Sequence, residues 1–106
     1  MWVFTNKGFV SIVQHYQDSD TLLVRARKRQ HLEVLFPGYE VQETLTGKDY
    51  WYRVFARRED VARIIADQIQ GIDYGNYKGS IPSSEQAYHD ACSAIWGVMY
   101  DYQRGR

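Results

Sequence analysis

The sequence predicts an α+β fold built on a five-stranded antiparallel sheet, and three patterns lead to this prediction. Residues 22–27 alternate between apolar and other side chains, as a strand with one buried face does. Residues 1–14 and 39–56 each contain two strand-like runs that flank a turn, which is typical of hairpins. Residues 61–72 and 84–102 carry apolar side chains at helical spacing.

The N-terminal hairpin comprises the β-branched and aromatic runs 1–5 and 9–14. Asn6-Lys7-Gly8 separates them, and both Asn and Gly tolerate the positive φ that many tight hairpin turns require. The third strand, 22–27, should bury its even-numbered side chains and turn its arginines to solvent.

A short helix follows around residues 32–36, where apolar residues have helical spacing until Pro37-Gly38 ends the segment. Residues 39–45 and 50–56 then form a second hairpin.

Two helices complete the chain. The first, 61–72, begins after Glu59 and Asp60, where acidic side chains favour the positive end of the helix dipole. The second is a long C-terminal helix over 84–102. The β-α-β-β-α portion from Thr21 to Gln70 matches most of a ferredoxin-like unit, and the N-terminal hairpin takes the place of its missing last strand. We expect the helices on one face of the sheet.

Length and composition indicate one domain, 1–106, with a loose tail at about 103–106. Thirteen basic and thirteen acidic residues cancel, so the overall charge does not favour nucleic acid or membrane binding. The single cysteine, Cys92, has no partner for an internal disulfide, and no secretory signal or long apolar run is evident. We therefore expect a cytoplasmic protein that does not insert into a membrane.

The connection between the last two helices is the first candidate site. It brings an acid, a base, an amide and two phenols close together in sequence: Asp73, Tyr74, Asn76, Tyr77 and Lys78. Such a loop could bind a polar ligand or partner. The alternative is structural, because Asp and Asn form turns and tyrosines pin loops to a core.

His89 lies near the start of the last helix. If the loop folds back over that helix, His89 could act with Asp73, Tyr77 and Lys78 as an acid or base, although a surface histidine is the simpler interpretation. His89 and Cys92 are one helical turn apart, but zinc requires more ligands than these two. We expect no metal, no cofactor and no assigned catalytic residue.

The second candidate site is a basic and aromatic face of the sheet. Its members are Arg25, Arg27, Arg29, Trp51, Arg53 and Phe55. Positive charge next to flat rings suits single-stranded nucleic acid, and the same side chains suit a protein interface or a homodimer. The structural alternative is that Glu40 and Glu43 on a neighbouring strand neutralise the arginines.

Several short motifs resemble a family of small uncharacterised bacterial proteins. They are Trp2-Val-Phe-Thr5, Gly8-Phe9 with Ser11, Leu22-Leu-Val-Arg-Ala-Arg27, Ile72-Asp-Tyr-Gly-Asn-Tyr-Lys78, and Tyr88-His89 with Trp96. The resemblance spans nearly the whole chain. It implies a compact cytoplasmic protein and no particular activity.

The sequence as a whole indicates a small binding or interaction domain with a protein partner or a second copy of itself. The first alternative is binding of nucleic acid or of a host defence complex, as a phage-type inhibitor would do. The second is a small enzyme that uses the 72–78 loop and His89.

Overall fold

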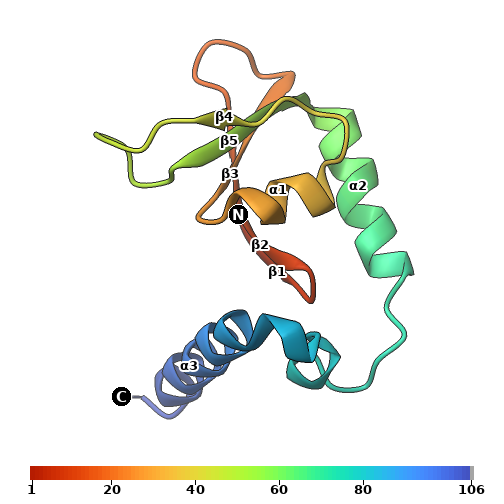
Figure 1. Cartoon of the computed structure of the whole chain (residues 1–106), viewed down its shortest axis with the longest axis vertical. Coiled ribbons are helices and arrows are strands. Elements are labelled where there is room, and N and C mark those ends of the chain that lie inside the picture. Colours follow the sequence, from red (N-terminus) through yellow and green to blue (C-terminus); the bar gives the residue numbers. More distant parts are fainter. Residues whose placement is uncertain (106) are drawn as a thin grey trace. The chain divides into compact units, whose positions relative to one another are not determined.

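The computed structural model describes residues 1–105 and confirms the α+β fold with a five-stranded antiparallel sheet (Figure 1). The chain forms two compact units, Met1–Ile72 and Asp73–Arg106, and each is described by itself. Of the predicted loose tail, Gln103 ends the last helix, and Arg106 lies outside the described residues.

The sheet belongs to the first unit and has the strand order β1-β2-β3-β5-β4. The strands are β1 (Trp2–Thr5), β2 (Gly8–Gln14), β3 (Thr21–Ala26), β4 (Gln42–Glu43) and β5 (Tyr52–Arg57). Every neighbouring pair is antiparallel, so β3 and β4 run parallel with β5 between them. This is the predicted ferredoxin-like arrangement, with β2 beside β3 in the position of the missing last strand.

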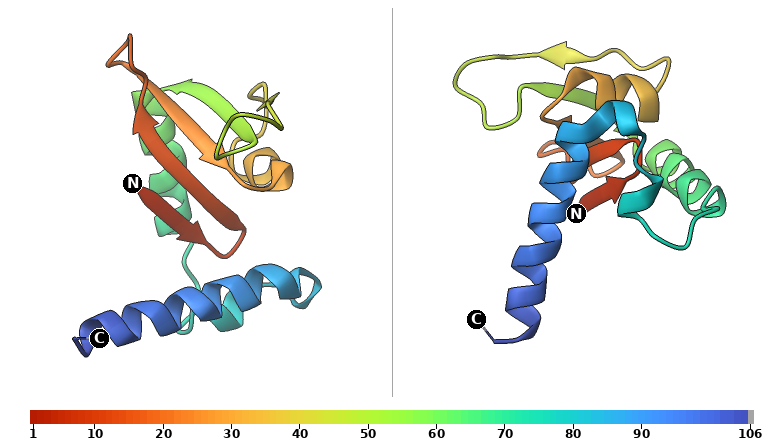
Figure 2. Two further views of the ribbon diagram at one scale, coloured as in Figure 1. Left: turned by 90° about the vertical axis from the view of Figure 1, so that its left-hand side faces the viewer. Right: turned by 60° about the horizontal axis from the view of Figure 1, so that its bottom comes forward.

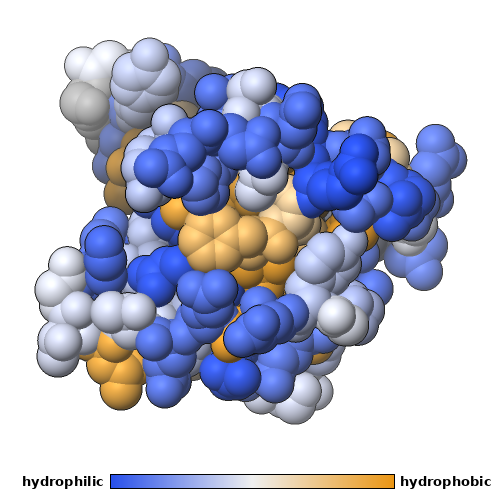
Figure 3. Space-filling view, turned by 90° about the horizontal axis from the view of Figure 1, so that it is seen from above, coloured by the Kyte–Doolittle hydropathy of each residue, from blue (hydrophilic) through white to orange (hydrophobic). Residues whose placement is uncertain are grey.

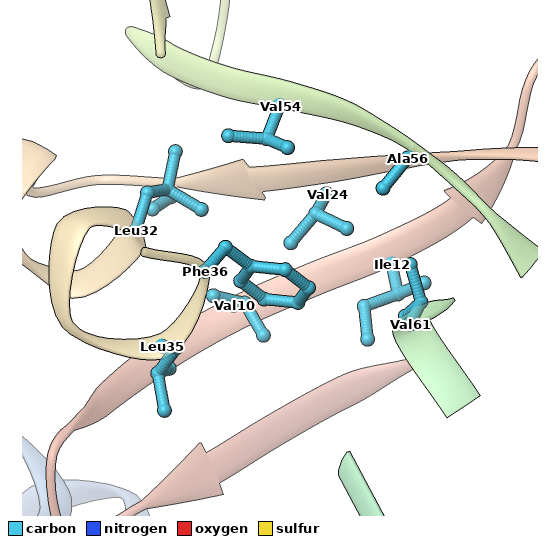
Figure 4. Close-up of a cluster of buried hydrophobic side chains, with 10 residues drawn as sticks. Val10, Ile12, Val24, Leu32, Leu35, Phe36, Val54, Ala56 and Val61 are labelled. Carbon is cyan, nitrogen blue, oxygen red and sulfur yellow. The ribbon is translucent and has the colours of Figure 1, made fainter. Parts of the chain in front are cut away.

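Both helices of this unit, α1 (Arg29–Leu35) and α2 (Arg58–Gln70), lie on the same face of the sheet (Figure 2). They bury a cluster of alternate strand residues, together with their own apolar side chains (Figure 4). The buried members are Val10, Ile12, Val24, Ala26, Leu32, Leu35, Phe36, Val54, Ala56 and Val61. Period-two burial along the strands therefore fixes which side of the sheet is the core.

The fourth strand is shorter than predicted. Pairing is confined to Gln42 and Glu43, opposite Arg53 and Tyr52. Upstream of β4, the partly buried side chains of Tyr39 and Val41 pack against the core. Tyr39 and Val41 thus contribute to the core without belonging to β4.

The second unit begins at Asp73 and contains two 3₁₀ turns, Lys78–Ser80 (η1) and Ser83–Glu85 (η2), followed by α3 (Gln86–Gln103). α3 exposes a row of large apolar side chains at Ile95, Val98, Met99 and Tyr102. Within residues 1–105, no helix combines the length and the apolarity that crossing a bilayer requires.

The turn of the N-terminal hairpin does not use the backbone conformation that we expected. Among residues 1–105, positive φ occurs only at Gly38, Gly47 and Gly105, so Asn6 and Gly8 do not adopt it. Gly8 is needed for a different reason. A Cβ at this position would lie 2.5 Å from Cγ of the buried His31 in α1, which is closer than packed atoms approach. The backbone N–H of Phe9 donates to His31 Nδ1 at 3.2 Å and thereby holds the ring in place.

We predict that Gly8→Ala lowers the free energy of unfolding by about 1–3 kcal/mol, because the added methyl overpacks the contact with His31. Urea denaturation measures the change. As a control, Lys7→Ala leaves a methyl side chain at an exposed site in the same turn, and it should change stability by less than about 0.5 kcal/mol. In a His31→Ala background the effect of Gly8→Ala should shrink. An equal effect in both backgrounds would show that the His31 contact is not the cause.

Candidate binding face of the sheet

The face of the sheet opposite α1 and α2 carries the alternate strand residues. We call it the open face, because no helix of the first unit covers it (Figures 1 and 2). Its members are Trp2, Phe4, Phe9, Ser11, Val13, Leu23, Arg25, Arg53 and Phe55. The surface therefore combines rings, aliphatic side chains and two arginines. Figure 3 shows one side of the molecule, on which an apolar patch is surrounded by hydrophilic residues.

Arg25 and Arg53 occupy the middle of the open face, directly opposite each other on β3 and β5. Like charges at opposed positions repel, and each guanidinium is only partly exposed. Arg25 Nη2 donates to Ser11 Oγ at 2.8 Å, and its Nε is buried with no hydrogen-bond partner. Among residues 1–105, neither arginine forms an ion pair with a carboxylate. No carboxylate of the described residues therefore compensates the positive charge of this pair.

Tyr50 is the point at which these arginines converge. Its ring is buried, and the guanidinium carbons of Arg25 and Arg27 lie 4.6 and 4.2 Å from its centroid. Arg53 donates to the Tyr50 carbonyl at 2.8 Å and to Thr44 Oγ1 at 3.0 Å. Cation–π contacts and hydrogen bonds together fasten the loop between β4 and β5 to the sheet.

Asp49 is the acidic residue in this cluster. Arg27 Nη1 lies 3.1 Å from Asp49 Oδ1, and this hydrogen bond raises the pKa of the Arg27 guanidinium. The residues around Tyr50 thus include one carboxylate, which pairs with Arg27, and three guanidiniums, those of Arg25, Arg27 and Arg53. The cluster remains positively charged.

The expected neutralisation by Glu40 and Glu43 is wrong. Within residues 1–105, neither glutamate forms an ion pair with an arginine, because Glu43 lies opposite Tyr52 and Glu40 precedes the short β4. The arginines are held by neutral oxygens and a ring instead.

Two groups of rings share the open face with the arginine pair. On β1 and β2, Phe4 stacks on Phe9 with centroids 4.4 Å apart, and Trp2 meets Phe9 edge to face at 5.9 Å. On β5, Phe55 lies two residues from Arg53, and its ring lies 5.4 Å from that of His15. Trp2 is 69 % exposed and Phe55 38 % exposed, so one ring of each group is accessible.

The structure does not bring together all six residues of the predicted basic and aromatic face. Arg29 lies on α1, on the helical side of the sheet, and pairs with Glu33 at 3.6 Å. Trp51 precedes β5 and is 48 % exposed. Arg25, Arg53 and Phe55 lie together on the open face, and Arg27 joins them through Tyr50.

In the second unit, the 72–78 loop makes mainly structural contacts. Asn76 Oδ1 accepts the backbone N–H of Gly79 at 2.7 Å, which is a turn-forming bond. Lys78 Nζ lies 4.7 Å from the ring centroid of Trp96. Asp73 is exposed and Tyr74 is partly buried, with its ring 6.4 Å from that of Tyr77.

Tyr77 connects this loop to α3. Its hydroxyl lies 3.1 Å from that of Tyr88 and 3.4 Å from Cys92 Sγ. Burial raises the pKa of Tyr77 and of Tyr88 well above the usual tyrosine value. Both hydroxyls are therefore neutral at ordinary pH and serve as hydrogen-bonding groups rather than as bases.

His89 interacts within its own helix. Its Nδ1 lies 3.4 Å from Asp90 Oδ1 and 3.5 Å from Gln86 Nε2, and both contacts are long for hydrogen bonds. Among residues 1–105, no three His, Cys, Asp or Glu side chains form a set of metal ligands.

An open apolar groove lies on the helical side of the first unit, between β2 and α2. Its lining includes Met1, Ile12, Leu22, Ile65 and Ile69. Arg58 at this groove donates to the Ser19 carbonyl and to Gln14 Oε1, so its donors have protein partners. The groove thus offers mainly apolar surface, with few polar groups that could select a particular ligand.

Sequence reasoning missed Tyr50 and the rings of the first hairpin. Val3, Val10 and Ile12 are apolar like Phe4 and Phe9, so β1 and β2 show no alternation that separates an inner from an outer face. The contact of Tyr50 with the arginines depends on how the preceding loop folds, for which the sequence has no local pattern.

Comparisons with protein-family models, with curated proteins and with solved structures found no match. The resemblance to small bacterial proteins therefore stays a prediction.

We predict that Tyr50→Ala destabilises the first unit by about 3 kcal/mol and loosens the loop between β4 and β5, because it removes a buried ring that two guanidiniums contact. Hydrogen exchange at the Thr44 amide, which donates to the Trp51 carbonyl at 2.9 Å, reports on the loop. Tyr50→Phe keeps the ring and should cost about 1 kcal/mol or less. Unchanged exchange in Tyr50→Ala would contradict the role of this residue.

The second unit should lose stability at alkaline pH. Because the pKa values of Tyr77 and Tyr88 are raised on folding, both phenols ionise at lower pH in the unfolded chain. Their contribution is thus fully present below about pH 10 and declines above it. Tyrosinate absorbance should keep rising above the pH at which exposed tyrosines are ionised, and Tyr77→Phe with Tyr88→Phe should reduce the amplitude of this late phase. Tyr39, whose pKa burial also raises, can contribute the remainder. A late phase of unchanged amplitude in the double variant would refute the assignment.

Proposed function

We propose that this protein is a small binding or interaction domain and that the open face is its contact surface. The observation that carries the proposal is the arrangement of Arg25 and Arg53, a charged pair without carboxylate partners, on the same face as the accessible rings of Trp2 and Phe55. Tryptophan and arginine are the side chains that concentrate binding energy at interfaces.

The shape of the surface also supports binding rather than catalysis. The open face is a broad sheet surface, whereas an active site needs converging groups in a concave pocket. In the second unit, the groups that a catalytic mechanism would use are engaged elsewhere. Tyr77 bonds to Tyr88 and Cys92, and His89 contacts Gln86 and Asp90. The enzymatic alternative gains no support from these contacts.

The same proposal includes a location in the cytoplasm, which the single cysteine favours. The proposal also covers the case in which this protein is a phage-type inhibitor and its partner is a protein complex, such as a host defence complex. An anionic partner suits the arginine pair best, because it would relieve the repulsion between Arg25 and Arg53.

A photo-crosslinking experiment in cells that carry the gene tests the proposal. We expect benzoylphenylalanine in place of Phe55 to form adducts with a discrete partner, because this ring lies on the open face and is partly exposed. The same amino acid in place of Asp67 on α2 is the control, since that exposed residue lies on the helical side. Identical adduct patterns at the two positions would refute the open face as the contact surface.

A further inference from the structure

We propose that the ligand of the open face is single-stranded nucleic acid. This inference rests on the proposed function and narrows it to one class of partner. Its phosphates would compensate the charge of Arg25 and Arg53, and its bases would stack on the exposed rings of the same face.

The two arginines of the open face already donate hydrogen bonds within the protein. Arg25 donates to Ser11, and Arg53 donates to Thr44 and to the Tyr50 carbonyl. All these acceptors are neutral, so the hydrogen bonds fix the guanidiniums without cancelling their charge. A polyanion gains from such a fixed pair, because release of its counterions favours binding.

The rings provide flat surfaces on which bases can stack, and charged side chains alone do not provide these. Trp2 lies in the same cross-strand row as Arg25 and Arg53, two strands from Arg25, and Phe55 lies two residues from Arg53 along β5. Both rings expose a substantial part of their surface. The strand spacing and the rise per residue place these two rings roughly 15–20 Å apart. A strand of nucleic acid that crosses the face diagonally would have a ring near each end of its path and the guanidiniums beside that path.

The geometry favours single strands over duplexes. A base can stack on a protein ring only when it is free of its own stack, as in single strands and loops. The grooves of duplex DNA admit a helix or a two-stranded ribbon, whereas the open face spans several strands. The protein would therefore distinguish single from double strands without reading sequence.

Fluorescence anisotropy with purified, nuclease-treated protein tests the inference. The probes are labelled oligo(dT) and oligo(rU) of about 20 nucleotides, longer than the footprint of most small domains, and a duplex of equal length. We expect binding of at least one single strand, with weaker binding of the duplex. For two to four phosphate contacts, the affinity should fall roughly 7- to 50-fold between about 50 and 200 mM salt.

Two variants separate charge from stacking. Arg53→Gln should weaken binding and reduce the salt slope by about 0.7, the contribution of one phosphate on a single strand. Phe55→Leu keeps an apolar side chain but removes the π face, and should weaken binding at least about fivefold. Arg63→Gln removes the same charge from α2, on the helical side, and should leave binding unchanged. Urea denaturation of each variant confirms that it is folded.

Three outcomes would overturn the inference. They are no binding of either single strand at low salt, equal binding of duplex and single strand, and equal losses in Arg53→Gln and Arg63→Gln. If the crosslinker at Phe55 nevertheless captures a discrete protein, the open face remains a binding surface and only the nucleic-acid assignment fails. If the crosslinker captures nothing specific, the proposed function fails as well.

Discussion

A single layer of helices packs on a five-stranded sheet, and this constraint shapes the first unit. Phe36, at the end of α1, and Val61 of α2 cover one side of the strands and complete the core. Strand residues alternate between the two faces, so each buried position on one side has a neighbour that points to the other. The open face is the counterpart of the core on the other side of the same strands.

Within the first unit, arginine side chains pack on that second face. Arg25, Arg27 and Arg53 reach the same residue, Tyr50, through its ring and its carbonyl group. Their apolar stems and planar head groups can cover a sheet surface while the charge stays near water. The loop that carries Tyr50 is thereby tied to the sheet, and the surface stays cationic without being polar throughout.

Most of the fold was predictable from sequence because the strands and helices have clear periodicity. The alternation around Val24 and the helical spacing after Glu59 determine the core side of β3 and the position of α2. The sites were less predictable. Three of the six residues chosen for the basic and aromatic face lie on the open face itself, since alternation places Arg25, Arg53 and Phe55 there. The role of Tyr50 depends on tertiary contacts that no local pattern records.

The brevity of β4 has a consequence for self-association. Beyond Arg53, no strand in the described part of the chain pairs with the outer edge of β5. Backbone groups along such an edge can recruit a foreign strand, which is a common start for aggregation. The last residue of β5, Arg57, is exposed and pairs with Glu59 at 2.6 Å. A foreign strand that paired with this edge would have to accommodate these charged side chains, and charge on an edge strand is a common protection against such pairing.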